Sequence, residues 1–438
     1  MAKTPVGTFL PLTSLKKFSD YLKFMDWLKK TEQSAWLMLP ISGPAVTPYR
    51  NYGIGYADTF LSAHLPKNEQ VWLLDRHNFL AENCDWIFDY ALYQALSEHF
   101  ATSAWWAWPK ELRLFEAEAL TAWRLKLSER MDFYIDQQYF LANQFALLRQ
   151  EAHQRQLTLI GDLPFYLSQE SPLVWANQNC FLLRKNGELY MQSGVPALSD
   201  EPFNSQFWGH PLYDWHDAGF DSIIDIFKLR LKFLAQFFDL VRIDHANGFF
   251  RFGIMYPDHP SWSKKVNGPG KTALKNLLNY TESIKLKIFF ENIGSETMSL
   301  EQFMKSNQIP GMSIVTLAYN LDHNDRSQLK LSKKQLSLSS YQGNQIIFTS
   351  THDTATLISW LKVLPPKIKQ KFLLLNHLSP DLNDHQLVSA IIDILKKQKS
   401  NLIIVPWQDW QQDTFRFNVP GHEELTNWNY FVNLNQLK

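Results

Sequence analysis

Cysteine is scarce in this 438-residue sequence, which has only Cys84 and Cys180. Neither belongs to a CxxC motif or a Cys/His cluster, so neither a metal site nor a disulfide framework is predicted. Basic excess is also lacking, because Lys+Arg and Asp+Glu both number 43 and the formal net charge is +0. Proteins that hold nucleic acid or an anionic membrane usually carry a basic excess or a basic stripe. We therefore expect a neutral partner, with neither nucleic acid nor membrane.

Long apolar stretches are missing as well. No segment approaches the ~20 apolar residues that a membrane-spanning helix needs. The first residues, Met-Ala-Lys-Thr-Pro-Val, do not resemble a signal peptide. The sequence therefore predicts a soluble cytoplasmic protein and leaves its oligomeric state open. We also find no internal repeat and no low-complexity tract.

Aromatic residues, in contrast, are plentiful: 16 Trp, 16 Tyr and 31 Phe make up 14% of the chain. Most of them must belong to a large aromatic core. Some Trp and Tyr side chains could instead form platforms for the apolar faces of sugar rings. Composition alone supports either use.

Short β-prone apolar runs alternate with longer segments of helical periodicity, which indicates βα units and a parallel sheet. Eight such runs predict a closed TIM (β/α)8 barrel in the α/β class. They are Gly7–Leu12, Ala35–Pro40, Leu157–Pro164, Phe238–Asp244, Lys287–Ile293, Met312–Thr316, Gln345–Thr349 and Leu402–Val405.

Helices and insertions fill the remaining sequence. Ser222–Phe237 is amphipathic, with Ile223, Phe227 and Leu231 on one side, and leads directly into a predicted strand. The segment of about 41–150 is too long for one βα connection, so we interpret it as a helical insertion. Residues 177–214 are rich in Gly, Pro, Ser and Asn and indicate a second, loop-rich insertion. Residues 1–438 are thus predicted to form a single barrel domain with two insertions.

Three acidic residues stand where predicted strands end. Asp244, Glu291 and Asp353 each follow an apolar run. Because parallel barrels assemble their active sites from the C-terminal ends of strands, we expect these side chains to converge. Taken singly, each acid would more often be a solvated loop charge or a helix cap than a catalytic group.

Such a cluster suits retaining glycosyl transfer. That chemistry needs one carboxylate as nucleophile and one carboxylic acid that protonates the leaving oxygen. Arg242 precedes Asp244 by two residues and so lies on the same strand face, where it favours the ionised form of that aspartate. His245 and His352 stand beside two of the acids and strengthen the interpretation.

The motifs Arg242-Ile-Asp-His245, Glu291 after an apolar strand and Thr351-His-Asp353 resemble three motifs of the α-amylase superfamily. Other segments resemble signatures of the amylomaltases, or 4-alpha-glucanotransferases, in order along the chain. These are Leu39-Pro, Thr47-Pro-Tyr49, Ile160-Gly-Asp-Leu-Pro-Phe-Tyr-Leu, Val174-Trp-Ala-Asn177, Gln206 to Trp215, Asn267 to Gly270, Pro310-Gly-Met312, Gln408-Asp409, Arg416 to Gly421 and Asn427-Trp428. The resemblance runs nearly end to end and implies a TIM barrel that acts on maltooligosaccharides and α-1,4-glucans without a metal or organic cofactor.

The resemblance also implies roles for individual residues. Asp244 is expected to be the nucleophile, Glu291 the general acid/base and Asp353 the stabiliser of the transition state. Six further residues are expected to contact sugar or the carboxylates: Arg242, His352, His245, Tyr49, Asp162 and Trp208. Three of these have equally plausible structural roles, namely a ring packed under a loop (Trp208), a hydrogen bond at a strand end (Asp162) and a packed histidine (His245).

The sequence departs from the family pattern close to all three acids. Asn292 replaces an aspartate, Ala246-Asn247 replaces Phe-Arg, and Thr354-Ala355 replaces Asn-Asp. We expect that the loss of a neighbouring charge at Asn292 lowers the pKa of Glu291 if the two side chains are close. The segment Ala197 to Phe203 also differs from the family's Pro-Asp-Tyr-Phe loop.

The expected function is therefore a 4-alpha-glucanotransferase that works through a covalent aspartyl-glycosyl intermediate. Two alternatives stay open: an α-glucan hydrolase, and a non-catalytic glucan-binding protein. Preferred chain lengths, cyclic products and the pathway are not determined by the sequence.

Overall fold

Eight parallel strands form a closed barrel in the computed structural model, which describes residues 4–43, 48–57, 73–196, 205–216, 219–294, 297–319, 336–419, 427–428 and 430–432. The order around the barrel is β1-β12-β11-β10-β9-β6-β3-β2. The strands are β1 (Val6–Phe9), β2 (Ala35–Leu37), β3 (Thr158–Leu163), β6 (Leu240–Ile243), β9 (Lys287–Phe290), β10 (Gly311–Ile314), β11 (Gly343–Phe348) and β12 (Ser400–Pro406). All eight predicted strands are thus confirmed, although several are shorter than predicted.

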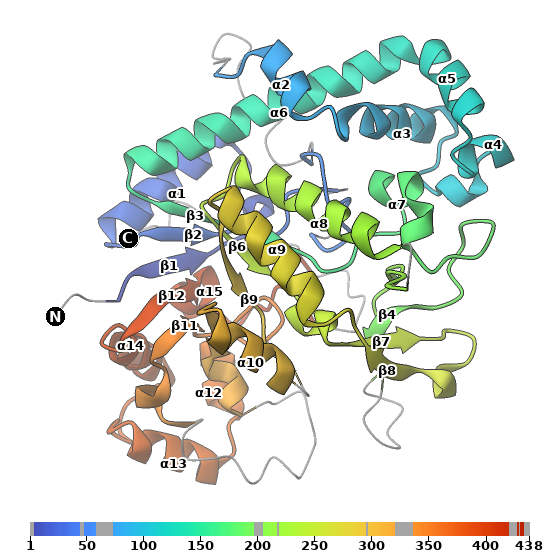
Figure 1. The fold of residues 1–438 in the computed structure, drawn as a ribbon. Helices are drawn as coiled ribbons and strands as arrows, with labels where there is room; N and C mark the ends of the chain where they lie inside the picture. The colour runs from blue at the N-terminus through green and yellow to red at the C-terminus, as the bar shows by residue number, and fades with distance from the viewer. Residues whose placement is uncertain are drawn as a thin grey trace.

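Helices cover the outside of the barrel (Figure 1). In chain order they are α1 (Phe18–Lys30), α6 (Ser128–Gln154), α8 (Phe220–Ala235), α9 (Lys271–Ser283), α10 (Met298–Ser306), α12 (Leu357–Val363), α13 (Pro366–Leu375), α14 (Asp384–Leu395) and α15 (Trp407–Gln411). The predicted helix over 222–237 is α8, and its apolar stripe is buried as expected, including Ile223, Phe227 and Leu231.

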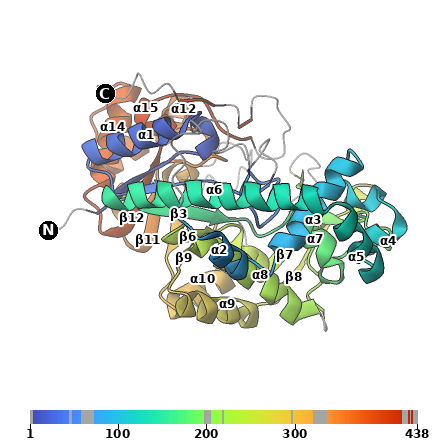
Figure 2. The same cartoon turned by 90° about the horizontal axis from the view of Figure 1, so that it is seen from above.

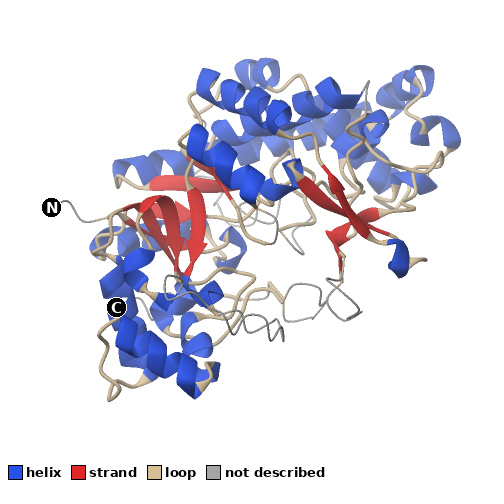
Figure 3. Ribbon diagram, turned by 60° about the horizontal axis from the view of Figure 1, so that its bottom comes forward, coloured by secondary structure: helices blue, strands red, loops and turns tan. Residues whose placement is uncertain are grey.

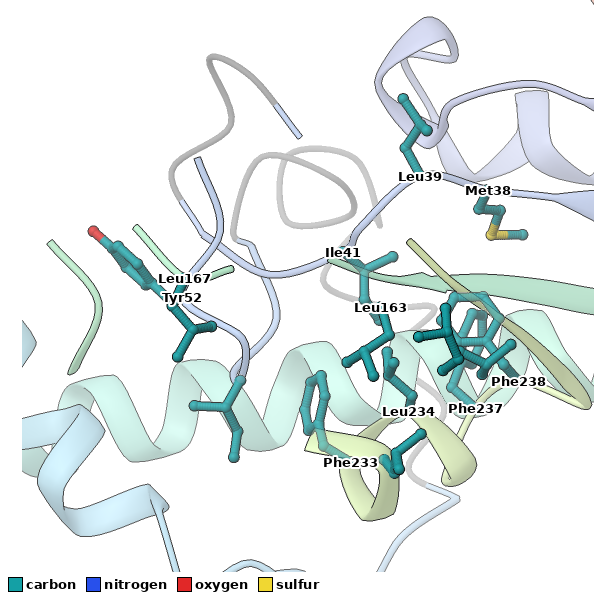
Figure 4. Packing of buried hydrophobic residues seen from close by; sticks show 14 of the residues in the cluster. Met38, Leu39, Ile41, Tyr52, Leu163, Leu167, Phe233, Leu234, Phe237 and Phe238 are labelled. Carbon is teal, nitrogen blue, oxygen red and sulfur yellow. The ribbon is translucent and has the colours of Figure 1, made fainter. Parts of the chain in front are cut away.

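The packing beneath α8 explains one glycine of the barrel. Figure 4 shows Phe233, Leu234, Phe237 and Phe238 gathered towards Leu163 of β3. A Cβ atom at Gly161 would lie 2.3 Å from the Phe238 ring, so only glycine lets that ring pack against β3. The strand β3 is held on both sides, since β2 pairs with residues 158–160 and β6 pairs with residues 160–163, including Gly161.

In the described residues between β2 and β3, four α-helices precede α6: α2 (Arg76–Glu82), α3 (Ile87–His99), α4 (Lys110–Arg113) and α5 (Ala117–Lys126). Figure 2 shows α6 running from the barrel out to this helical region. Many of the chain's aromatic residues pack here, together with Trp175 of α7 (Pro172–Ala176); Trp105 and Trp175 are fully buried. The boundaries of the two insertions stay predictions.

A second sheet, which the sequence did not predict, stands apart from the barrel (Figure 3). Its order is β5-β4-β7-β8, and all of its pairings are antiparallel. The strands are β4 (Gln192–Val195), β5 (Gln206–Phe207), β7 (Arg251–Met255) and β8 (Lys264–Asn267). The sheet therefore joins the segment that follows β3 to the segment that follows Asp244.

No helix in the described part of the chain is both long and apolar enough to cross a membrane.

Candidate active site

The three predicted acids stand directly after or close to the ends of barrel strands. Asp244 follows β6 and Glu291 follows β9, and each continues the strand ladder through its backbone. The Asp244 N–H donates to the Leu163 carbonyl, and the Glu291 N–H donates to the Ile243 carbonyl, both at 3.0 Å. Asp353 lies five residues beyond the end of β11. The C-terminal edge of the barrel thus places all three acids on the same side of the molecule, as predicted.

Arg242 is the centre of the site. It pairs across the sheet with Asp162, and its Nη1 lies 2.8 Å from both oxygens of that carboxylate. Its Nη2 lies 2.7 Å from Asp244 Oδ1 and 3.0 Å from Glu291 Oε2. Only 5% of the Arg242 side chain is exposed, so one buried guanidinium holds three carboxyl groups. The expected nucleophile, Asp244, and the expected acid/base, Glu291, therefore both contact the Nη2 atom of Arg242.

Tyr49 and His352 connect this centre to the third acid. The Tyr49 hydroxyl donates to Asp162 Oδ2 at 2.8 Å, accepts from Arg242 Nη1 at 3.2 Å and lies 3.1 Å from His352 Nε2. His352 Nε2 is in turn 2.9 Å from Asp353 Oδ2, and the Tyr49 and His352 rings stack at 5.3 Å. The contacts therefore form one continuous network from Arg242 to Asp353.

The Asp353 carboxylate is the most open of the three, with 39% of its side chain exposed against 20% for Asp244 and 19% for Glu291. Asn418 donates to Asp353 Oδ1 at 2.6 Å, and Arg416 donates to the Asp353 carbonyl. Burial opposes ionisation of Asp353, but His352, Asn418 and Arg242 outweigh it, so the pKa of Asp353 is lowered. Asp353 is thus held as a carboxylate that faces outward.

His245 lies beside Glu291 and has an unusual backbone. Its φ of +45° is left-handed, a conformation that a non-glycine residue adopts only when its surroundings impose it. In that conformation its N–H donates to Glu291 Oε2 at 2.7 Å. The imidazole packs edge-on against Trp208, with ring centroids 5.1 Å apart, and burial lowers its pKa. The buried Nε2 atom has no hydrogen-bond partner among the described residues.

Asp244 and Glu291 are hydrogen-bonded to each other and titrate as a pair. Burial raises the pKa of Asp244 well above its usual range; Arg242 opposes that shift, and the Glu291 carboxylate adds to it. Burial acts in the same direction on Glu291, but Arg242, the contact with Asp244 and the His245 N–H together lower the pKa of Glu291. The pKa values of the two carboxyl groups are thus shifted in opposite directions, upward for Asp244 and downward for Glu291.

All nine predicted site residues thus lie in one contact network, although their roles stay predictions. Asp162 has no exposed side-chain surface, so its contacts favour the structural alternative, in which it holds Arg242 and Tyr49. Trp208 is half-buried against His245 and donates from Nε1 to Gln206 at 2.9 Å, which leaves both of its interpretations open. Sequence reasoning assigned no role to Asn418, although the motif from Arg416 to Gly421 contained it.

The residues that depart from the family pattern make specific contacts in the structure. Asn292 Oδ1 accepts the Met312 N–H at 2.8 Å and so links β9 to β10, a contact that an aspartate could also make. Thr354 Oγ1 accepts from the Thr351 N–H at 2.9 Å and bonds the Thr316 hydroxyl at 3.0 Å. Ala246 and Asn247 are buried, and Ala355 packs partly into the core around α12 and α14. The predicted difference at 197–203 lies outside the described residues.

Among the residues that the structure describes, no group of three or more His, Cys, Asp or Glu side chains is arranged to hold a metal ion. The site contains two adjacent carboxyl groups, Asp244 and Glu291, and a third carboxyl group, Asp353, whose pKa is lowered. On a TIM barrel with its site at the strand C-termini, such a cluster of carboxyl groups is typical of a carbohydrate-active enzyme.

Comparison with known proteins narrows the class to one family. The sequence profile of glycoside hydrolase family 77, described as 4-alpha-glucanotransferase, matches residues 56–435, and the chain belongs to this family. It is 29% identical over 358 residues to the chloroplastic/amyloplastic 4-alpha-glucanotransferase of Solanum tuberosum, a match that covers 79% of this chain and 58% of that protein. It is 26% identical over 463 residues to the 4-alpha-glucanotransferase of Aquifex aeolicus, covering 94% of this chain and 90% of that protein.

Two solved structures share the fold. The amylomaltase of Streptococcus agalactiae, in complex with acarbose, superposes with a TM-score of 0.84 at 23% identity, covering 100% of this chain and 96% of that one. The amylomaltase of Corynebacterium glutamicum gives a TM-score of 0.73 at 13% identity, covering 99% and 73%. Both comparisons confirm the predicted barrel with insertions.

Proposed function

We propose that the chain is an active 4-alpha-glucanotransferase that transfers α-1,4-glucan segments between maltooligosaccharides. The observation that carries the proposal is the pairing of Asp244 and Glu291 on one Arg242 nitrogen, at 2.7 and 3.0 Å. Family membership supports the reaction class, and the acarbose complex of the Streptococcus agalactiae amylomaltase supports a sugar ligand.

The proposed first half-reaction begins with a donor glucan between the two carboxyl groups. Asp244 attacks the anomeric carbon as a carboxylate, while Glu291 protonates the glycosidic oxygen that leaves. The reaction requires Glu291 protonated and Asp244 ionised, so substrate binding must replace the hydrogen bond between the two side chains. Arg242 keeps contact with Asp244 and so favours the ionised nucleophile.

In the second half-reaction Glu291 takes a proton from an incoming glucan hydroxyl, which attacks the covalent intermediate and restores Asp244. Charge develops on the sugar ring as it approaches the oxocarbenium ion. The outward-facing Asp353 carboxylate, fixed by His352 and Asn418, is suited to stabilise that positive charge. No metal or organic cofactor is needed for either step.

The test is incubation of the purified chain with maltotriose and chromatography of the products, beside an Asp244→Asn control. A ladder of longer maltooligosaccharides with released glucose, absent from the control, supports the transferase. Glucose and maltose without longer products would instead identify an α-glucan hydrolase. Maltooligosaccharide binding without any product, unchanged in the Asp244→Asn variant, would contradict both and identify a glucan-binding protein.

A further inference from the structure

A short loop carries two members of the site. It spans residues 351–356 between the end of β11 and the start of α12, and it contains His352 and Asp353. Inside the loop, Thr351 Oγ1 accepts the Asp353 N–H at 3.2 Å and Thr354 Oγ1 accepts the Thr351 N–H at 2.9 Å. From outside, Thr316 bonds Thr354, and the Asn418 N–H donates to the His352 carbonyl at 3.0 Å. Such a loop needs support from outside if its carboxylate is to keep one position.

Asp409, on α15, supplies that support at both ends of the loop. Its Oδ2 accepts the hydroxyl of Thr349 at 2.5 Å and the hydroxyl of Ser350 at 2.6 Å, immediately before the loop. Its Oδ1 accepts the Leu357 N–H at 2.7 Å, immediately after the loop. The Asp409 carboxyl group therefore hydrogen-bonds to the residues on both sides of the loop 351–356.

Asp409 is buried and is not part of an ion pair among the described residues. The residue has no exposed surface, and no cation is paired with it among the described residues. A buried carboxyl group is unfavourable unless hydrogen bonds replace its hydration. Burial raises the pKa of Asp409, whereas Ser350, Thr349 and the Leu357 N–H oppose that rise. The three bonds thus offset the cost of burial, and they hold two side-chain hydroxyls and one backbone N–H at the two ends of the loop.

We propose that Asp409 is a positioning residue, which fixes the loop 351–356 so that His352 and Asp353 meet the reacting sugar in the correct geometry. The inference rests on the proposed function, since the geometry matters only if the site turns over. Asp409 does not touch the substrate in this proposal and acts only through the loop.

Kinetics of Asp409→Ala provide the first test, with maltotriose as substrate. Because misplacement of a catalytic group by about 1 Å costs on the order of 100-fold in rate, we expect kcat to fall by about that factor. KM should change by no more than about threefold, because ground-state binding is not the interaction that is lost. Asp409→Asn retains polar groups for all three contacts and should stay within about tenfold of the unmodified enzyme.

Asn376→Ala is the matched control. Asn376 is also a buried polar residue with three bonds: it accepts the Leu338 N–H and donates to the carbonyls of Leu336 and Phe372. It touches none of the site residues, so its loss should lower stability without lowering the kcat of the folded protein. Equal kcat values for Asp409→Ala and Asn376→Ala would overturn the proposal.

A double-mutant cycle tests whether Asp409 affects activity through Asp353. With an activated glycosyl fluoride as donor, Asp409→Ala should cost little further activity in an Asp353→Asn background, because the two changes act through one group. A full additional 100-fold loss in that background would mean that Asp409 acts elsewhere, against the proposal.

Amide hydrogen exchange separates this inference from the proposed function. If the unmodified chain makes no product from maltotriose, the proposed function fails, but the role of Asp409 can still be measured. Exchange over residues 350–357 should be faster in Asp409→Ala than in Asn376→Ala and in the unmodified chain. Unchanged exchange there would overturn the positioning role regardless of activity.

Discussion

Replacing Arg242 with methionine should destabilise the protein in a pH-dependent way. The substitution keeps most of the apolar stem but removes the guanidinium that contacts Asp162, Asp244 and Glu291. Removing one partner of a buried ion pair costs about 3–5 kcal/mol. An unfolding entropy of about 2.1 cal/mol/K per residue makes 1 kcal/mol equivalent to about 1 °C in a chain of 438 residues. We expect Tm to fall by about 3–5 °C at pH 8, where the carboxyl groups are most strongly ionised.

The sign of the pH dependence follows from the contacts of Arg242. Arg242 lowers the pKa of Asp162, Asp244, Glu291 and Asp353, so its removal raises all four values in the folded state. A carboxyl group whose folded pKa exceeds its unfolded value binds more protons when folded. Its contribution to stability is therefore lost as pH rises from the unfolded value, about 4, through the folded pKa. The destabilisation should accordingly be smaller at pH 5 than at pH 8.

The assay is thermal unfolding of Arg242→Met and the unmodified chain between pH 5 and 8, with Arg230→Met as matched control. Arg230 is equally buried, but it donates to the carbonyls of Pro164 and Phe165 and to the Tyr213 hydroxyl, not to a carboxylate. Its loss should lower Tm by a nearly constant amount across that range. If Arg242→Met behaves in the same constant way, the carboxyl groups do not depend on Arg242, and the reasoning is refuted.

Three further predictions concern catalysis. Asp244→Asn should lower kcat by about 10⁴-fold or more and leave glucan affinity, measured by calorimetry, nearly unchanged; loss of both would indicate misfolding. The pH profile of kcat/KM should be bell-shaped, because activity requires one proton on the Asp244–Glu291 pair, and loss of that proton from the pair gives the alkaline limb; a profile flat from pH 5 to 9 would contradict this. Asn418→Ala removes a bond to the ionised Asp353, worth about 1.5–3 kcal/mol, so kcat/KM should fall roughly 10- to 150-fold; an unchanged value would show that Asp353 does not need that bond.

The barrel could be predicted from sequence because its strands are buried on both faces. Leu402–Val405 and Ile346–Thr349 are continuous apolar or β-branched runs, whereas the helix α14 between them alternates apolar and polar residues, and that contrast is distinctive. The second sheet could not be predicted in this way. Its strands β4 and β5 contain four and two residues, with Gln, Ser and Gly among them, and form only by pairing with segments distant in sequence.

The sequence predicted which residues meet at the site, but it did not predict the contacts that shift their pKa values. Register places Asp162 opposite Arg242, and strand ends bring Asp244 beside Glu291, so convergence follows from topology. The opposite pKa shifts of Asp244 and Glu291 depend on burial and on the left-handed backbone of His245, which directs its N–H to Glu291, and neither feature is visible in the sequence. The same holds for Asn418, which reaches Asp353 from 65 residues further along the chain.

The closure of the barrel has a consequence for biosynthesis. β1 pairs with β12, so Val6 lies opposite Ile403 and Phe9 opposite Pro406. At about 5–20 residues per second, a ribosome adds the roughly 400 intervening residues over tens of seconds. During that time one edge of β1 lacks its backbone partner, an arrangement that invites pairing with other chains. Asn418 emerges later still, so the nascent chain lacks part of its site until the ribosome has passed residue 418.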